Sequence, residues 1–266
     1  TSFNVNDSSG AATYQYALDI PSGRRGMSPS LALSYSSEQK NQMNLFGYGW
    51  NLDTGYITRN REKGSEKIYT ENDFTLNIFG TQKKLVPISL TDGKHGEYGA
   101  EMEDEFLKIT FQKDESWTVT SKSGTKYTFG KTAATRQDDT SDTTKIYQWM
   151  LQEIRDTNDN FMRFTYTKDS GAIIPEKIFY AGSGTSDGPY EINFTTEKRT
   201  DIFTSYAPGF LVTNQYRVKE LVLLVNSKWS KKWTLSYTND GNQKKSLLKS
   251  ITAKSQDNGG NITTLP

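Results

Sequence analysis

The 266-residue sequence contains no cysteine and only one histidine. Disulfide bonds and thiolate metal sites are therefore excluded, and zinc would depend on carboxylates around a single imidazole, a poor match for its usual ligands. We accordingly expect no metal and no cofactor. No apolar run approaches the roughly 18 residues that cross a bilayer, so we also expect no membrane span.

The sequence also lacks an excess of charge of either sign, because 32 basic and 31 acidic side chains give a formal charge of +1. Such a chain has no long-range field with which to attract nucleic acid or anionic lipid, so we expect no nucleic-acid partner. The absence of cysteine fits either a reducing cytosol or an exported protein. Composition therefore leaves the compartment open.

Aromatic residues are abundant, although only 33% of the residues are hydrophobic. The 15 Tyr, 13 Phe and 5 Trp must supply much of the buried surface, and such residues are typical of β-strands. Apolar and polar residues alternate along most of the chain, for example at Tyr14, Tyr16 and Leu18, as half-buried strands require. We therefore predict an all-β protein, an extended antiparallel sheet or meander of hairpins that is shell-like or sandwich-like, with little or no helix.

Three segments are less clear in this pattern. Residues 146–154 fit helical as well as strand spacing, and we interpret them as a strand. Residues 131–145 lack large apolar side chains and residues 181–189 are rich in Gly and Ser, so both are predicted to be mobile loops. Neither marks a domain boundary, and we interpret residues 1–266 as a single β domain.

Few side chains suggest catalysis. His95 stands in a glycine-rich turn, where a surface position is a more natural interpretation than a general base. The acidic run 101–105 contains Glu-x-Glu twice, a spacing that ADP-ribosyltransferases use on a strand, but a charged strand edge is the favoured interpretation. A hydrolase or transferase that uses the carboxylates of Glu101, Glu103 and Glu105 stays an alternative, while we expect no enzyme.

The run from Asp156 to Asn160 begins like a calcium-binding loop. The sixth and twelfth positions hold Phe161 and Thr167 in place of Gly and Glu, which excludes an EF-hand. Asn and Asp tolerate left-handed backbone conformations, so the run predicts a tight hairpin turn.

A carbohydrate-binding β module is a further alternative, because exposed Trp and Tyr rings can stack on sugars. Most of the Trp residues, however, stand in alternating segments, and this position favours the core of the protein.

Two segments in the N-terminal part carry a dense set of matches to a known pattern, namely GAATYQYALDIPSGRRGMSPSLALSYSS and LFGYGWNLDTGYITR. The matching positions are Tyr14, Pro21, Gly23, Gly26, Pro29, Leu31, Leu33, Tyr35, Gly47, Gly49, Trp50 and Leu52. In this order they resemble the SpvB-type amino-terminal domain, which is found in the B components of insecticidal toxin complexes and in related RHS/YD-repeat proteins. The likeness is strong over residues 10–59 and looser over 145–167 and 229–266.

The glycines of the second segment are interpreted as backbone features. Gly47 and Gly49 would let a strand bend or approach another backbone closely, with Trp50 turned into the core beside Leu52. We therefore expect Trp50→Ala to lower the free energy of unfolding by about 3–5 kcal/mol, as large-to-small core changes do.

Two positions depart from the family pattern, since Arg25 and Asp159 stand where glycines are usual. These departures leave the conformation of the two loops open. Charged residues such as Lys83, Lys84 and Glu101 are expected to limit edge-to-edge aggregation of strands.

The resemblance implies a non-enzymatic structural module. It would contribute to, or cap, a β-sheet shell that encloses a toxic polypeptide in a secreted bacterial protein, with assembly in the cytoplasm before export as one route. The chain, which begins at Thr1 and not at Met, is expected to be an N-terminal piece of a longer one. Its expected partners are downstream RHS/YD-repeat or propeller segments of the same polypeptide and toxin-complex-like subunits.

Overall fold

The computed structural model describes residues 2–5, 10–39, 43–78, 80–102, 105–239, 241, 245–257 and 259–265. Strands make up most of this part of the chain, and the only helices in it are short 3-10 helices. These are η1 (Arg24–Gly26), η2 (Ser37–Gln39), η3 (Ser65–Lys67) and η4 (Ala133–Thr135). The prediction of an all-β fold with little helix is confirmed.

A small antiparallel sheet, here called the N-terminal sheet, is built from the first strands of the chain. Its order is β1 (Ser2–Val5), β2 (Ala12–Ala17), β3 (Ala32–Ser36) and β6 (Trp50–Leu52). A separate hairpin of β4 (Met43–Asn44) and β5 (Gly47–Tyr48) lies between β3 and β6 in the chain. Most of the residues that carry the family resemblance therefore lie in this sheet or in its loops.

A closed barrel of eight strands follows. Its strands are β7 (Tyr56–Arg59), β8 (Phe74–Ile78), β9 (Thr81–Leu90), β10 (Gly96–Ala100), β11 (Lys108–Phe111), β12 (Trp117–Thr120), β13 (Lys126–Phe129) and β15 (Asp142–Arg155). Neighbours in this order pair with each other, and β15 closes the ring because it pairs with both β13 and β7. Closure removes the free strand edges that an open sheet would expose here.

Aromatic rings fill the barrel. Trp117, Trp149 and Phe74 are fully buried. The ring of Phe111 stacks on Trp117 at a centroid distance of 4.2 Å, and Phe74 meets Trp117 edge-on at 4.9 Å. Stacked and edge-on pairs are the arrangements that ring quadrupoles favour. With Trp233 also buried, the interpretation that most Trp residues belong to the core is confirmed.

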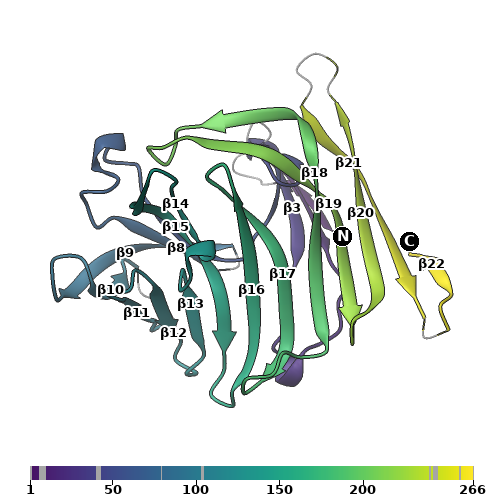
Figure 1. Ribbon diagram of the computed structural model, residues 1–266, viewed down its shortest axis with the longest axis horizontal. Helices are drawn as coiled ribbons and strands as arrows, with labels where there is room; N and C mark the ends of the chain where they lie inside the picture. Colours follow the sequence, from purple (N-terminus) through teal and green to yellow (C-terminus); the bar gives the residue numbers. More distant parts are fainter. Residues whose placement is uncertain are drawn as a thin grey trace.

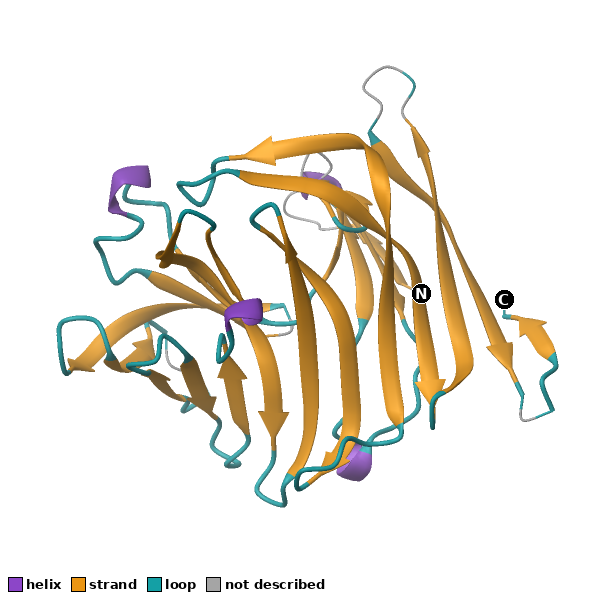
Figure 2. Ribbon diagram, viewed as in Figure 1, coloured by secondary structure: helices purple, strands orange, loops and turns teal. Residues whose placement is uncertain are grey.

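The strand β15 also begins a large open sheet, because it pairs with β14 (Arg136–Asp139) and β16 (Asn160–Asp169). From there the chain runs as an antiparallel meander through β17 (Ala172–Ser183), β18 (Tyr190–Ser205), β19 (Val212–Val225), β20 (Lys228–Asn239), β21 (Ser246–Gln256) and β22 (Ile262–Thr264). Figures 1 and 2 show these long strands as a curved wall that leads from the barrel to the C-terminus.

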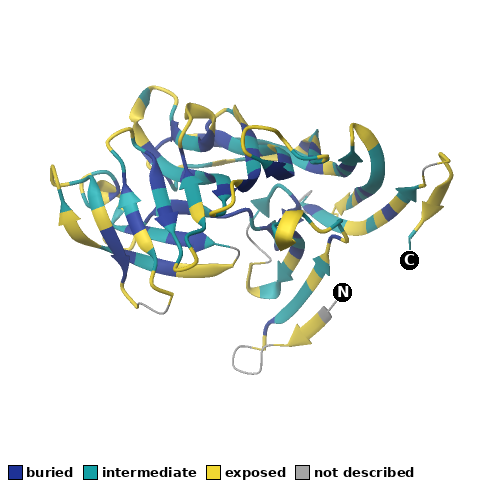
Figure 3. Cartoon of the chain, turned by 90° about the horizontal axis from the view of Figure 1, so that it is seen from below, coloured by how far each residue is buried: buried dark blue, intermediate teal, exposed yellow. Residues whose placement is uncertain are grey.

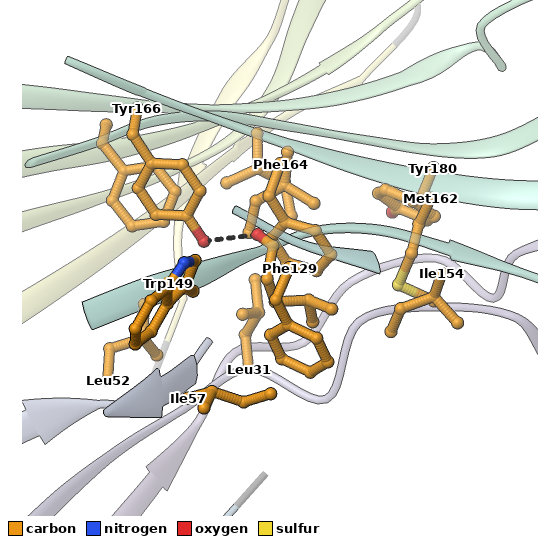
Figure 4. Close-up of a cluster of buried hydrophobic side chains, with 14 of the residues drawn as sticks. Leu31, Leu52, Ile57, Phe129, Trp149, Ile154, Met162, Phe164, Tyr166 and Tyr180 are labelled. Atoms are coloured by element: carbon orange, nitrogen blue, oxygen red, sulfur yellow. Dashed lines mark hydrogen bonds between the residues drawn. The ribbon is translucent and has the colours of Figure 1, made fainter. Parts of the chain in front are cut away.

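The N-terminal sheet packs against one face of this large sheet. Leu33 of β3 belongs to the same buried cluster as Leu221 of β19 and Trp233 of β20. Within that cluster the hydroxyl of Tyr166 donates a hydrogen bond of 2.8 Å to the carbonyl of Leu151 (Figure 4). In Figure 3 the buried positions gather inside the barrel and where the two sheets meet. Removal of this apolar surface from water is the main force that holds the layers together.

The ambiguous segment 146–154 is a strand, as predicted. It lies within β15, and its residues Trp149 and Leu151 are fully buried. The strand pattern prevails over the helical one because β15 has partners on both sides.

The prediction of a loop over residues 131–145 was wrong. This segment contains η4, all of β14 and the start of β15, which together form a hairpin. The polar side chains bond among themselves: Asp139 accepts from Ser141, and Asp138 forms an ion pair of 2.6 Å with Lys168. Backbone pairing on one side is sufficient for β14, so it needs no large apolar residues. Residues 181–189 begin in β17 and leave the strand after Ser183.

The expectation that Lys83, Lys84 and Glu101 lie on an exposed strand edge and limit edge-to-edge aggregation was also wrong. The two lysines lie in β9, which pairs with β8 on one side and β10 on the other. The side chain of Lys83 is almost buried and lies 3.6 Å from a carboxylate oxygen of Glu105. Glu101 follows β10, and its amide donates to the carbonyl of Lys84. Barrel closure is the reason, because it leaves no edge at this place.

Candidate functional site

The family signature forms the seam between the N-terminal sheet and the large sheet. Register places Tyr14, Tyr35 and Trp50 side by side on β2, β3 and β6. The ring of Trp50 lies 5.9 Å from that of Tyr14 and 5.5 Å from that of Tyr35. Trp50 is half-buried against the core, whereas Leu33 and Leu52 are buried in it.

The partial burial of Trp50 narrows the expected effect of its removal. Trp50→Ala would lose two aromatic contacts but would open less of the core than at a fully buried position. We therefore expect a loss near the lower end of the range for such changes, about 3 kcal/mol, measured by urea denaturation. An unchanged free energy of unfolding would contradict the assignment of Trp50 to the seam.

Close backbone approach explains the glycines of the signature. Gly47 has a φ of +92°, and a Cβ atom added there would lie 2.7 Å from the carbonyl oxygen of Ser246. Gly49 has a φ of +77°, and its added Cβ would lie 2.6 Å from the ring of Tyr35. The amide of Val218 also donates to the carbonyl of Leu45 at 2.7 Å. The hairpin β4–β5 is thus pressed onto β19 and β21.

The loop between β2 and β3 carries the remaining signature residues, Pro21, Gly23, Gly26, Pro29 and Leu31. It folds around η1, Pro29 and Leu31 are buried, and a Cβ on Gly23 would collide with the carbonyl oxygen of Met27. These residues shape and anchor the loop and form no pocket of reactive groups.

Arg25 and Asp159, which replace the usual glycines, both keep the left-handed backbone that glycine favours. Their φ angles are 48° and 58°. Such a conformation costs a residue with a Cβ about 1–2 kcal/mol, so the surrounding contacts must hold both turns in place. In the second turn Asp156 accepts hydrogen bonds of 2.8 Å from the amides of Asn158 and Asn160. This is the hairpin turn that the sequence predicts between β15 and β16.

A buried ion pair that sequence reasoning missed fastens the same seam. Arg199 lies 2.9 Å from the carboxylate of Asp201, and both side chains are almost wholly buried. Asp201 accepts 2.6 Å hydrogen bonds from the amide and the hydroxyl of Ser246, and Arg199 donates to the carbonyl of Asn44. The pair therefore ties β18 to β21 and to β4. The sequence signal that could have revealed it is the pair of opposite charges two residues apart on one strand.

Burial alone would raise the pKa of Asp201. The hydrogen bonds from Arg199 and Ser246, together with the charge of Arg199, outweigh burial and hold the pKa below its ordinary value of 3.8. The carboxylate is therefore ionised at neutral pH.

His95 does not have the exposed surface position that the sequence suggests, because its side chain is only 12% exposed. Its Nδ1 atom lies 2.8 Å from Asp92 and its Nε2 atom 3.0 Å from Glu115. Its ring also lies against Phe111 at 4.8 Å. Both ring nitrogens are occupied, so the geometry is that of a structural link at one end of the barrel.

The other candidate catalytic groups do not converge. Glu101 and Glu105 are exposed and lie outside the strands, and Glu103 lies outside the described residues. Among the described residues no group of three or more His, Cys, Asp or Glu side chains is arranged to hold a metal ion. A search of the same residues for a helix long and apolar enough to span a membrane finds none.

A cavity with a volume of about 1040 Å³ lies between the N-terminal sheet, the barrel and the large sheet. Asn and Gln are the most frequent residues in its lining. Of the described residues that line it, Asp53 alone carries an ionisable carboxylate, and none is Lys, Arg, Glu or His. The described part of the lining is therefore polar but almost uncharged.

The free end of the large sheet is the other notable surface. Within the described part of the chain, β22 pairs with β21 and has no strand on its other side. Its three residues are exposed, as Figure 3 shows beside the C-terminus. An unpaired strand edge of this kind offers amide and carbonyl groups to another strand.

These features define an all-β scaffold, a closed barrel that opens into a long curved sheet and is braced by a second, small sheet. The chain belongs to the SpvB family, described as Salmonella virulence plasmid 65kDa B protein, which matches residues 6–186 and thus more than half of the chain. The resemblance predicted from the signature is confirmed.

Curated relatives include the Mono(ADP-ribosyl)transferase SpvB of Salmonella choleraesuis and that of Salmonella enteritidis. Each is 25% identical to this chain over 187 residues. The match covers 61% of this chain but only 30% of either relative. The chain thus corresponds to less than a third of the length of these proteins.

Solved structures share the fold. The crystal structure of TcdB2-TccC3 superposes with a TM-score of 0.79 at 17% identity, over 100% of this chain and 16% of that one. The Photorhabdus luminescens Tc holotoxin pore gives 0.82 at 18%, with the same coverage of 100% and 16%. The N-terminal domain of effector protein SpvB from Salmonella typhimurium strain LT2 gives 0.77 at 18%, over 91% and 99%. At these identities the likeness establishes the fold.

Proposed function

We propose that this chain is a structural module that contributes strands to, or caps, the β-sheet shell of a secreted, toxin-complex-like protein of the RHS/YD-repeat kind. The shell would enclose a toxic polypeptide until delivery. The observation that carries the proposal is the large sheet, in which β16 to β22 form an unbroken antiparallel meander that ends in an unpaired edge. Another strand can extend such a sheet without any change to the fold.

The fold comparisons support this role. Two of the similar structures are assemblies of toxin-complex components, and the likeness extends over the whole of this chain. We infer that its partners are downstream segments of the same polypeptide and toxin-complex-like subunits. Export from a bacterium, after assembly in the cytoplasm, is part of the proposal and is in keeping with the virulence protein that gives the family its description.

The proposal assigns no catalysis to this region. Curated relatives are named mono(ADP-ribosyl)transferases, but the match covers 30% of their length, which leaves ample chain for a separate catalytic domain. Both ring nitrogens of His95 are held by carboxylates, those of Asp92 and Glu115, which supports a structural role for this residue.

The hydrogen-bond pattern of β22 makes a sharp test feasible. The amide of Leu265 donates to the carbonyl of Ala253, and the amide of Asp257 donates to that of Asn261. Because the pattern alternates along an antiparallel pair, the amides of Ile262 and Thr264 point away from β21. Proline at either position would remove an outward donor while leaving the pairing with β21 intact.

The test is co-elution of this chain with the segment that we propose follows Pro266. We expect wild type and Thr264→Ala, which keeps the amide, to associate with that segment in size-exclusion chromatography. Thr264→Pro should weaken the association by about tenfold or more, which corresponds to about 1.4 kcal/mol. Absence of association in the wild type, or an equal affinity of the Pro and Ala variants, would contradict the proposal.

A further inference from the structure

The wall of the large cavity that belongs to the barrel is a row of polar side chains. Register aligns Tyr56 of β7 with Asn77 of β8 and Gln82 of β9. Their sequence neighbours Ile57 and Leu76 are buried inside the barrel. Since side chains alternate along a strand, the polar row projects from the outside of the barrel, and all three residues line the cavity.

Two further glutamines extend this wall. Gln137 of β14 and Gln148 of β15 are opposite each other in the ladder, and both line the cavity. The facing wall repeats the pattern, because Gln15, Ser34 and Asn51 are aligned across β2, β3 and β6 and also line it. The cavity is thus bounded on two sides by ordered rows of amides and hydroxyls.

Many of these amides have no partner in the protein. Within the described part of the chain, no hydrogen bond to protein engages the side chains of Gln15, Asn51, Gln82, Gln148 and Asn214. None of these amides is sealed from solvent, so they do not carry the penalty of a buried unsatisfied group. Each offers both a donor and an acceptor to a molecule in the cavity.

The described lining residues offer almost no charge to a ligand. Asp53, the single carboxylate, already accepts a 2.8 Å hydrogen bond from the amide of Gly55. Burial raises the pKa of Tyr56 and of Tyr166, so both hydroxyls remain protonated at neutral pH. Among the described lining residues, a phosphate or a carboxylate would find no cationic partner, and an ammonium group would find only Asp53.

We propose that this cavity binds a neutral oligosaccharide. Sugar hydroxyls both donate and accept hydrogen bonds. The carboxamides without a protein partner on the two walls can both donate to and accept from such hydroxyls. The volume of about 1040 Å³ is at the upper end of the range for small-molecule sites, roughly 300–1,000 Å³, and so suits a chain of several sugar units.

An extended polypeptide is the competing occupant, because amides also bond to backbone groups. The lining favours the sugar, since hydrogen-bonding side chains outnumber apolar ones among the described residues that line the cavity. This site does not depend on the shell role, because the cavity lies away from the edge strand β22.

The test is a titration of the 266-residue chain with defined hexasaccharides, in which binding is measured by isothermal titration calorimetry and by Trp fluorescence. Maltohexaose, cellohexaose and chitohexaose are the neutral probes, and a hyaluronan hexasaccharide is the anionic comparator. The double variant Gln82→Ala with Gln148→Ala removes one amide from each of two strands of the barrel wall. The control is Gln256→Ala, an intermediate-exposure residue of β21 that does not line the cavity.

We expect at least one neutral probe to bind, with affinity reduced tenfold or more in the double variant and changed less than twofold in the control. Thermal melts should show that all variants are folded. The proposal is overturned if no neutral probe binds at millimolar concentration, if the anionic probe binds equally well, or if the double variant binds like wild type. Displacement of the sugar by an unstructured neutral peptide of higher affinity would assign the cavity to polypeptide instead.

Discussion

Single residues hold the β4–β5 hairpin against the large sheet, and Gly47 illustrates how. A glycine in a strand predicts a bend or a close approach, and the structure shows both a left-handed backbone and the nearby carbonyl of Ser246. The identity of that partner could not be predicted, because Ser246 lies near the other end of the chain. The burial of His95 was likewise not predictable, because it depends on the way in which the barrel brings Phe111 and Glu115 to its ring.

Gly47→Ala should therefore destabilise the protein more than an ordinary glycine substitution. The added Cβ combines an unfavourable φ with a clash against backbone, for which we expect a loss of about 2–3 kcal/mol in urea denaturation. Gly26→Ala is the matched control, because its φ is +78° but no atom lies within 4 Å of an added Cβ. That variant should lose only about 1 kcal/mol. If both variants lost the same free energy of unfolding, the close approach of Gly47 to Ser246 would not contribute to stability.

Elements whose one face is buried were predictable from alternation, as β2, β3 and β15 illustrate. The hairpin strand β14 was not, because its polar residues carry no such pattern and it is ordered by pairing with β15. The contacts of Arg199 and Asp201 that join β4, β18 and β21 could not be predicted either, because they connect segments that are distant in the sequence.

That link predicts a specific dependence of stability on pH. The pKa of Asp201 is lower in the folded protein than its ordinary value of 3.8, so its contribution is present above that value and is lost as the pH falls through the folded pKa. Asp201→Asn should be less stable than wild type at pH 7, and the difference should shrink below about pH 4. Urea denaturation between pH 7 and pH 3 measures it. A difference that stays constant over this range would contradict the role of the carboxylate.

At the scale of the whole molecule, the all-β class and the family could be predicted, but the closed barrel could not. Closure depends on the pairing of β7 and β13 with the same strand, β15, and no local pattern encodes which distant strands meet. In the described part of the chain, the consequence is a molecule with two unlike ends, a barrel without free edges and a curved sheet that ends at the unpaired β22. This asymmetry gives the sheet one direction in which it can grow.

Electron cryo-microscopy of the intact polypeptide that contains this chain would show whether β22 is the place where the sheet continues. We expect a further strand hydrogen-bonded to the outer edge of β22, and a sheet that continues from there into a closed shell around an internal space. A β22 edge that faces solvent, in a molecule without an enclosed space, would contradict it.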